Sequence, residues 1–227
     1  IDGSSVQLSI MAGPALTLPI PAGGDRTTVT IWQSAVEAGG ISGEADARLS
    51  VWLGRPVRLV FFDRKSSRQA DADWAGAGVP VTFSDGFPLL ITTTGSLAAL
   101  NRDLADDGHP TVPMNRFRPN IVIDNEAPWH EDRWRELRIG GVVLDLVKPC
   151  QRCIVPSQDQ ETGAQTGPGP MPALRRLRRS ADPRVKGVIF GWNAVPRNPG
   201  MIRTGDEVEM VREEAAAWPL AGQPANR

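Results

Sequence analysis

The chain has little cysteine, no tyrosine, no long apolar run and almost no net charge. Its 227 residues contain only two cysteines, which excludes a small domain built on disulfides and predicts a cytoplasmic protein. No apolar stretch approaches the ~20 residues of a membrane span, and no charged-then-apolar leader opens the sequence. The 25 Lys and Arg residues almost balance the 26 Asp and Glu residues. This balance argues against a dedicated nucleic-acid-binding or membrane-surface protein.

Both cysteines fall in one short stretch, Lys148-Pro149-Cys150-Gln151-Arg152-Cys153. Two thiols beside Lys148 and Arg152 are well placed to be thiolates, which are nucleophiles or ligands for soft metals. A charged loop is an expensive place for sulfurs that serve packing alone. We therefore predict that the functional site lies here.

Other readings of a Cys-x-x-Cys pair remain open. A zinc site would have to borrow His109 and His130, which do not form a ligand-like pair. Haem attachment requires a histidine after the second cysteine, where Ile154 stands. A thioredoxin-type pair precedes a helix, whereas Ile154-Val155-Pro156 predicts a strand. Two buried, inert cysteines are the alternative without function.

The first third of the chain predicts short strands around one helix. Strands are expected at 29–32 and 55–62, with a helix over 42–54 that Ser42 caps and Gly54 ends. Trp32 and Trp52 are expected in the core, because aromatic burial dominates cores. The polar, glycine-rich segment 63–78 predicts a linker or mobile loop.

The rest of the chain again predicts mostly strands. The expected elements are strands at 79–83, 87–94 and 121–123, a helix at 96–103, a hairpin over 136–147 about Gly140-Gly141, closing strands at 187–193 and 201–210, and a helical or frayed tail from 212. Many short strands with few helices favour a barrel-like β architecture.

Several motifs carry a family resemblance in combination. They are Asp85-Gly86-Phe87-Pro88, Ser96-Leu97 with Leu100-Asn101, Arg116-Phe117-Arg118-Pro119-Asn120, Lys148-Pro149-Cys150 with Arg152-Cys153, Asp159 with Thr162-Gly163, and Phe190-Gly191 with Asn193. In this order, over about 28–211, the chain resembles the MOSC domain, named for the C-terminal part of molybdenum cofactor sulfurase. Within that family it resembles the amidoxime-reducing and iron–sulfur-linked reductases.

The resemblance implies a mainly β fold with a few helices (α+β). A MOSC-type β-barrel would occupy 63–211, preceded by part of a MOSC N-terminal β-barrel domain over 1–62 and followed by a tail over 212–227. The sequence begins at Ile1, inside that N-terminal part. The Lys-Ser pair that the family places earlier is therefore expected to be missing, since Lys65-Ser66 does not match it in order. We expect this truncation to weaken cofactor retention.

The resemblance also implies a cofactor, molybdopterin with molybdenum. By position, Cys153 would be the protein ligand of the metal, and Cys150 is the less favoured choice. Arg152 and Lys148 would hold the thiolate form, and Arg152 is also expected to bind the cofactor. The family is also associated with pyridoxal phosphate, for which no residue of this chain gives support.

Other residues are expected to contact the cofactor. Arg118 offers a fork for phosphate or pterin oxygens, and Asn120 offers a donor and an acceptor. The remaining candidates are a second cation and the start of a helix that could hold a phosphate: Arg116, Thr94, Ser96. The alternatives are a salt bridge for Arg118 and a helix cap for Ser96.

Asp85 stands where the family has an acid near the metal. It could orient water or substrate or assist proton delivery. Its alternative role is that of a turn residue bonded to its own backbone.

The resemblance implies an oxidoreductase that reduces small N-hydroxylated compounds. Electrons would come from a separate ferredoxin- or cytochrome-type donor with its reductase, because two cysteines cannot hold a four-thiolate iron–sulfur cluster. The basic run 175–179 would be a docking patch for that donor or a solvated face. The alternatives are a non-catalytic MOSC module that binds or delivers cofactor or handles its sulfur, and a truncated barrel without cofactor.

Overall fold

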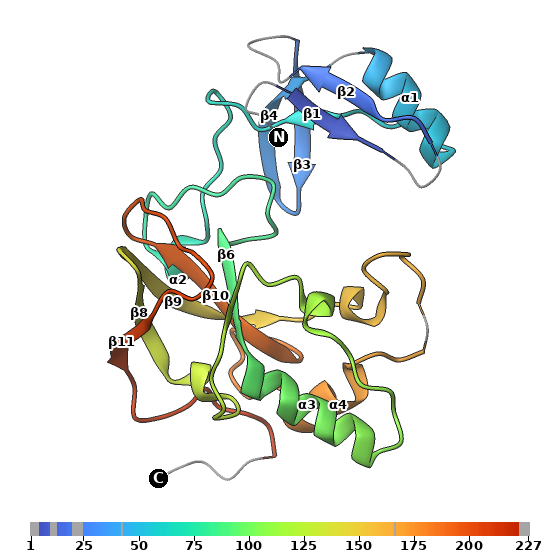
Figure 1. Ribbon diagram of the computed structural model, residues 1–227. Coiled ribbons are helices and arrows are strands. Elements are labelled where there is room, and N and C mark those ends of the chain that lie inside the picture. The colour runs from blue at the N-terminus through green and yellow to red at the C-terminus, as the bar shows by residue number, and fades with distance from the viewer. Residues whose placement is uncertain (1–4, 10–12, 20–24, 42, 166, 223–227) are drawn as a thin grey trace. The chain divides into compact units, whose positions relative to one another are not determined.

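The computed structural model describes residues 5–9, 13–19, 25–41, 43–165 and 167–222. The chain divides into two compact units, residues 1–70 with 77–86 and residues 71–76 with 87–227. Each unit has its own strands and helices (Figure 1). Among the described residues, no helix combines the length and the apolar character needed to cross a membrane.

The first unit contains two small antiparallel sheets and one helix. One sheet is a two-stranded ribbon, and the other has the strand order β3-β4-β5. Helix α1 ends at Leu53, and Gly54 follows with a φ of 64°, so the predicted glycine stop is confirmed. The predicted cap at position 42 lies outside the described residues. The elements are β1 (Ser5–Leu8), β2 (Leu16–Pro19), β3 (Arg26–Ile31), β4 (Ser34–Gly40), α1 (Gly43–Leu53) and β5 (Val60–Phe61).

Two predictions for this unit are wrong. Trp32 lies in the two-residue turn between β3 and β4, where it is 75% exposed rather than in the core. The expected strand at 55–62 shrinks to Val60–Phe61. The reason is that side chains of α1 take the backbone N–H groups that a longer strand would use. Val57 N donates to Ser50 Oγ and Leu59 N donates to Asp46 Oδ1.

The second unit is built on one six-stranded sheet with the order β11-β8-β9-β10-β6-β7, which curls strongly (Figure 1). Strands β6 and β7 pair in parallel, and the other neighbours pair antiparallel. The mainly β fold with a few helices is confirmed. The elements are α2 (Ala72–Ala75), β6 (Leu89–Thr93), α3 (Thr94–Asp106), β7 (Ile121–Ile123), β8 (Trp134–Ile139), β9 (Val142–Gln151), α4 (Met171–Leu177), β10 (Ile189–Pro196) and β11 (Val208–Glu213), with the 3-10 turns η1 (Met114–Phe117), η2 (His130–Asp132) and η3 (Val155–Ser157).

Two clusters of buried side chains stabilise this unit. One lies between β8, β9 and β10 and includes Leu137, Leu144 and Trp192. The other joins β10 to α3 and α4, which lie side by side (Figure 1), and includes Leu100, Leu174 and others. The hairpin expected at 136–147 is confirmed, since Ile139 pairs with Val142 across the glycine turn.

Four local expectations for the rest of the chain are wrong. The strand expected at 201–210 begins only at Val208. Residues 79–83 form only an isolated bridge between Gln69 and Pro80, because proline has no N–H to donate to a ladder. The segment after the cysteines is the 3-10 turn η3 and not a strand. The tail is neither helical nor frayed up to 222: Trp218 and Leu220 are buried in the first cluster, and Trp218 Nε1 donates to Ser180 Oγ at 3.0 Å.

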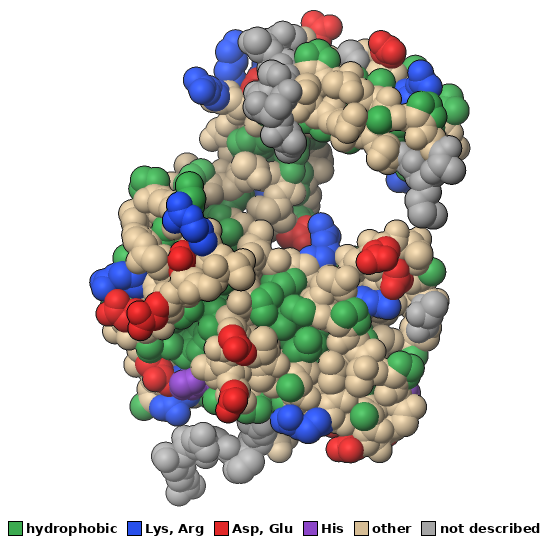
Figure 2. All heavy atoms as spheres, viewed as in Figure 1, with side chains coloured by type: hydrophobic (Ala, Val, Ile, Leu, Met, Phe, Trp, Pro, Cys, Tyr) green, Lys and Arg blue, Asp and Glu red, His purple; other side chains and the backbone are tan. Residues whose placement is uncertain are grey.

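Charges of both signs are interspersed on the visible face of the second unit (Figure 2). Several charged side chains of this unit pair, as Arg138 does with Glu209 at 2.7 Å and Arg135 with Glu214 at 2.8 Å. The balance of charge seen in the composition therefore extends to the surface in this view.

Gly191 allows β10 to approach β6 closely. Its φ is 73°, and an added Cβ would lie 2.6 Å from the carbonyl oxygen of Ile91. The register of β10 against β9 also shifts between Ile189 and Trp192. A residue with a side chain cannot occupy this position without moving the backbone of β6.

We predict that Gly191→Ala lowers the free energy of unfolding by about 2–5 kcal/mol, because left-handed strain adds to overpacking. Gly187→Ala is the matched control: its φ is 92°, but nothing lies within 4 Å of an added Cβ. Denaturant unfolding of both variants measures the difference. Equal losses would show that the close approach to β6 contributes nothing.

Candidate functional site

The cysteine loop begins at the end of β9. Cys150 lies within this strand and is half-buried, whereas Cys153 follows the strand and is exposed. Strand β9 is paired on both sides, with β8 and with β10, so the loop starts from the fixed end of an interior strand. Cys153 is therefore the thiol that a ligand from solvent can reach.

A turn that carries two arginines is tied to this loop. It is formed by η1 and ends at Arg118, which has a left-handed backbone (φ 53°, ψ 47°) and is exposed. Phe117 is fully buried and stacks on Phe190 of β10, with ring centroids 3.8 Å apart. A left-handed arginine is a strained conformation of the kind that gathers at functional sites.

Arg152 connects the loop to the turn. Its Nη1 donates to Cys150 Sγ at 3.1 Å, and its Nη2 donates to the carbonyl oxygen of Phe117 at 2.9 Å. The guanidinium also lies over the Phe117 ring, 5.5 Å from the centroid. Lys148, the other cation expected to hold a thiolate, instead lies over the rings of Trp74 and Phe87, at 5.0 and 5.9 Å.

A second loop orients Arg116. Arg116 Nη2 lies 3.3 Å from Asp159 Oδ2, while Asp159 Oδ1 accepts hydrogen bonds from the N–H groups of Glu161 and Thr162 and from the Thr162 hydroxyl. The hydrogen bonds from Thr162, with that from Glu161, lower the pKa of the Asp159 carboxyl. The Asp159-x-x-Thr162-Gly163 motif is thus a structured turn that keeps a carboxylate against Arg116.

Two buried donors near this turn have no hydrogen-bond partner within the described protein. They are Nε of Arg116 and Nε of Arg152. A buried N–H group without an acceptor is costly. Both atoms belong to arginines of the cysteine loop and the arginine turn, so an anionic or oxygen-rich ligand here would meet unused donors.

Asn120 is partly committed to the fold. Its Oδ1 accepts a hydrogen bond from Leu90 N at 2.8 Å, and its own N donates to Leu90 O at 3.0 Å. This exchange extends the pairing of β6 with β7. Its exposed carboxamide keeps the Nδ2 donors for a ligand, and its cofactor contact stays a prediction.

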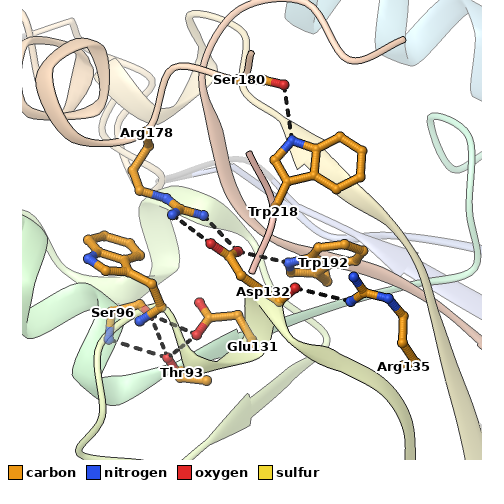
Figure 3. A network of polar contacts seen from close by, with 10 residues as sticks. Thr93, Ser96, Glu131, Asp132, Arg135, Arg178, Ser180, Trp192 and Trp218 are labelled. Carbon is orange, nitrogen blue, oxygen red and sulfur yellow. Dashed lines mark hydrogen bonds and ion pairs between the residues drawn. The ribbon is translucent and has the colours of Figure 1, made fainter. Parts of the chain in front are cut away.

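The start of α3 departs from expectation at one residue. Ser96 is fully buried, and its hydroxyl lies 2.8 Å from Glu131 Oε2 and accepts a hydrogen bond from Trp129 N at 2.8 Å (Figure 3). The Ser96 side chain is therefore bonded within the protein, and its predicted cofactor contact stays a prediction. Ser96 is not the helix cap, because Thr93 holds that position and accepts from Ser96 N.

Thr94 and Asp85 are exposed, and their predicted roles stay predictions. The Thr94 hydroxyl donates to Asp124 Oδ1 at 2.8 Å. Asp85 lies in the first unit, where its backbone oxygen accepts from Arg68 Nη2 at 2.7 Å. Arg68 thereby fixes the turn from which the Asp85 side chain projects.

The basic run 175–179 is neither a uniform docking patch nor a solvated face. Arg176 clamps α4 to α3 by contacts of 2.6 Å to Asp103 and to Asp107. Arg178 is 1% exposed and forms a buried two-pronged ion pair with Asp132, at 2.7 and 2.8 Å. Only Arg175 and Arg179 are exposed without such an anchoring contact in the described structure.

A buried polar network around Glu131 and Asp132 was not predicted from the sequence (Figure 3). Asp132 accepts from Arg178 and from Trp192 Nε1, the latter at 3.0 Å. Its neighbour Glu131 is also fully buried, with Oε1 unpartnered among the described protein atoms. Burial, above all, raises the pKa of the Glu131 carboxyl. Adjacent acids in a loop would ordinarily be expected on the surface.

Neither histidine gathers with the cysteines in a metal cluster. His109 pairs with Asp107 at 3.3 Å and His130 with Glu213 at 3.0 Å. Over the described ranges, no three side chains of His, Cys, Asp or Glu come together in a way that could hold a metal ion.

The fold and the site define a class of protein: a curled, mainly β domain with one exposed thiol in a loop that is hydrogen-bonded to a turn carrying two arginines. Residues 79–209 match the model of the MOSC domain. The chain belongs to the MOSC-domain family, and the resemblance stated from its motifs is confirmed.

Curated relatives agree with this assignment. The chain is 34% identical to mitochondrial amidoxime-reducing component 1 of Homo sapiens over 224 residues, which cover 92% of this chain and 64% of the relative. It is 36% identical to component 1 of Mus musculus, covering 68% and 46%. It is 31% identical to component 2 of Bos taurus, covering 68% and 47%. The chain thus spans between about half and two thirds of the length of these relatives.

We predict that replacing each buried acid by its amide changes stability by very different amounts. Glu131→Gln should change the free energy of unfolding by less than about 1 kcal/mol near pH 4, because the raised pKa keeps the Glu131 carboxyl neutral there, as an amide is. Asp132→Asn should cost about 3–5 kcal/mol, because Arg178 is left as an unpaired buried charge.

The pH dependence follows from the same raised pKa. A protonated Glu131 contributes stability that is fully present below the unfolded pKa of about 4.3 and is lost as the pH rises through the folded value. Wild type should therefore lose stability relative to Glu131→Gln as the pH rises. Urea unfolding between about pH 4 and pH 9 measures this difference, and parallel curves would contradict the assignment.

Proposed function

We propose that this protein is an oxidoreductase that holds the molybdenum cofactor and reduces small N-hydroxylated compounds with electrons from a separate donor protein. The observation that carries the proposal is the exposed Cys153 thiol in a loop that Arg152 ties to the turn ending at the left-handed, exposed Arg118. The MOSC match and the amidoxime-reducing relatives support it.

The residues present fit this cofactor. A thiolate is a suitable donor for molybdenum, and Cys153 is the accessible thiol of the chain. The pterin carries a phosphate, for which an arginine fork is the matching partner. Arg118 is exposed for that purpose, and the unused Nε donor of Arg116 adds a second point of attachment.

When bound, the cofactor would supply the two-electron chemistry at the metal. The balanced reaction takes an N-hydroxylated substrate, two electrons and two protons to the reduced nitrogen compound and water. Cys153 would anchor the metal, and Arg118 with Arg116 would neutralise and orient the phosphate. Asp85 is our proposed participant in proton delivery or water positioning. The electrons would come from a ferredoxin- or cytochrome-type protein with its own reductase.

The test is production of the full-length protein in a host that makes the cofactor. We expect about one molybdenum and one pterin per chain, and reduction of an aromatic amidoxime with a chemical donor such as reduced viologen but not with NADH alone. Cys153→Ser should lose activity by at least about a hundredfold, because an alcohol is a poorer ligand than a thiolate. Cys150→Ser should be milder.

The outcomes separate the candidate functions. Molybdenum and pterin without turnover would favour a module that binds or delivers the cofactor. Full activity in Cys153→Ser, with loss in Cys150→Ser, would transfer the ligand role to Cys150. A chain that binds neither metal nor pterin in that host would overturn the proposal.

Arg118 allows function to be separated from stability. We predict that Arg118→Gly keeps or raises the free energy of unfolding, by up to about 1–2 kcal/mol, because glycine relieves the left-handed strain. The same variant should lose pterin, since the fork for the phosphate is gone. Thermal unfolding and pterin content measured on one preparation test both. A variant that is destabilised and still retains pterin would assign Arg118 to the fold alone.

A further inference from the structure

Arg152 differs from the other arginines of the site because two of its side-chain nitrogens donate hydrogen bonds to acceptors of the protein in two different segments. One bond goes to Cys150 Sγ and the other to the carbonyl oxygen of Phe117. Its own backbone N donates to Val188 O at 2.9 Å. One side chain thus joins the end of β9 to the turn formed by η1.

Phe117 is a rigid anchor for this tie. It is fully buried, and its ring stacks on Phe190 of β10. It also lies directly between Arg116 and Arg118 in the chain. A bond to its carbonyl oxygen therefore fixes the distance between the cysteine loop and both arginines of the turn.

We propose that Arg152 is a positioning residue that holds Cys153 at a fixed distance from Arg118, rather than a residue that binds the cofactor itself. The inference rests on the proposed function for its purpose, but the tie is a property of the protein alone. Cys153 and Arg118 would hold the metal and the phosphate of one cofactor. A change in the distance between the two residues would therefore misplace the metal relative to the substrate.

The fork of the guanidinium is what the tie requires. Two acceptors, a sulfur and a carbonyl oxygen, are reached by two nitrogens of one planar group. A lysine keeps the charge but provides a single nitrogen. If geometry is the purpose of Arg152, lysine cannot replace it; if only positive charge beside the thiols matters, lysine can.

The experiment compares Arg152→Lys and Arg152→Met with wild type, with Arg102→Met as the matched control on the exposed surface of α3. The first readout needs no cofactor: hydrogen–deuterium exchange of the apoprotein. Arg118 N donates to Asn115 O at 3.0 Å, and we expect its amide to exchange about tenfold faster in both Arg152 variants. The hairpin at 136–147 should be unchanged, as should every region in Arg102→Met.

The second readout uses the loaded enzyme. With a chemical electron donor, we expect kcat to fall about tenfold in Arg152→Lys and Arg152→Met, with KM changed less than twofold. The electron paramagnetic resonance line of the metal should broaden, reporting several ligand geometries. Should Arg152→Met fail to fold, Cys150→Ala removes one end of the tie, and it should speed exchange at Arg118 while Cys150→Ser does not.

Three results would overturn the inference. Rescue by Arg152→Lys in both readouts would reduce Arg152 to a charge. Loss of pterin with unchanged exchange at Arg118 would make it a cofactor contact. Unchanged exchange with unchanged kcat would leave it without a role. Failure of the proposed function is a separate outcome, seen as wild type without molybdenum, and the exchange readout still decides whether the tie exists.

Discussion

The close approach of β10 to β6 at Gly191 is the constraint on which the second unit depends. Strand β10 lies between β9, which carries the cysteine loop, and β6, which leads into α3. The shift in register around Gly191 sends Phe190 to one buried cluster and Trp192 to the other. Phe190 then supports the arginine turn through Phe117, while Trp192 donates to Asp132 in the buried network. The register shift at Gly191 thereby supports both the arginine turn and the buried polar network.

The buried polar network is a costly means of fixing that arrangement. A buried ion pair such as Asp132–Arg178 contributes little net stability, because desolvation offsets much of the attraction. Its geometry is nevertheless demanding: one carboxylate must meet a guanidinium and an indole N–H together. Few alternative packings satisfy all of these hydrogen bonds at once. The network therefore fixes how α4, η2 and β10 pack against one another, even though it adds little net stability.

The sequence predicted the parts of the fold that depend on local pattern. The hairpin about Gly140 and the glycine stop after Leu53 depend on neighbours within a few residues, and both are confirmed. The errors depend on distant partners. Trp32 is exposed because it occupies a turn, and residues 55–59 lose their strand to side chains of α1. The described part of the tail, up to residue 222, has a fixed place because Trp218 packs into the cluster formed by β8, β9 and β10.

The arginines show most clearly why the site could be predicted only in part. Arg116, Arg118, Arg152 and Arg178 are identical as letters, and motif resemblance selected the first three. Their environments differ according to partners far away in the sequence: Asp159 for Arg116, Phe117 for Arg152 and Asp132 for Arg178. Arg118 is distinguished by its exposed, left-handed position. A guanidinium can hydrogen-bond two loops together, pair with a carboxylate at the surface or in the core, or stay available for a ligand. The acceptors around it determine which of these roles it has. The different roles of these arginines are therefore a property of the tertiary structure. Arg118, which the fold leaves exposed in a strained backbone conformation, is the arginine best suited to bind a ligand from outside the chain.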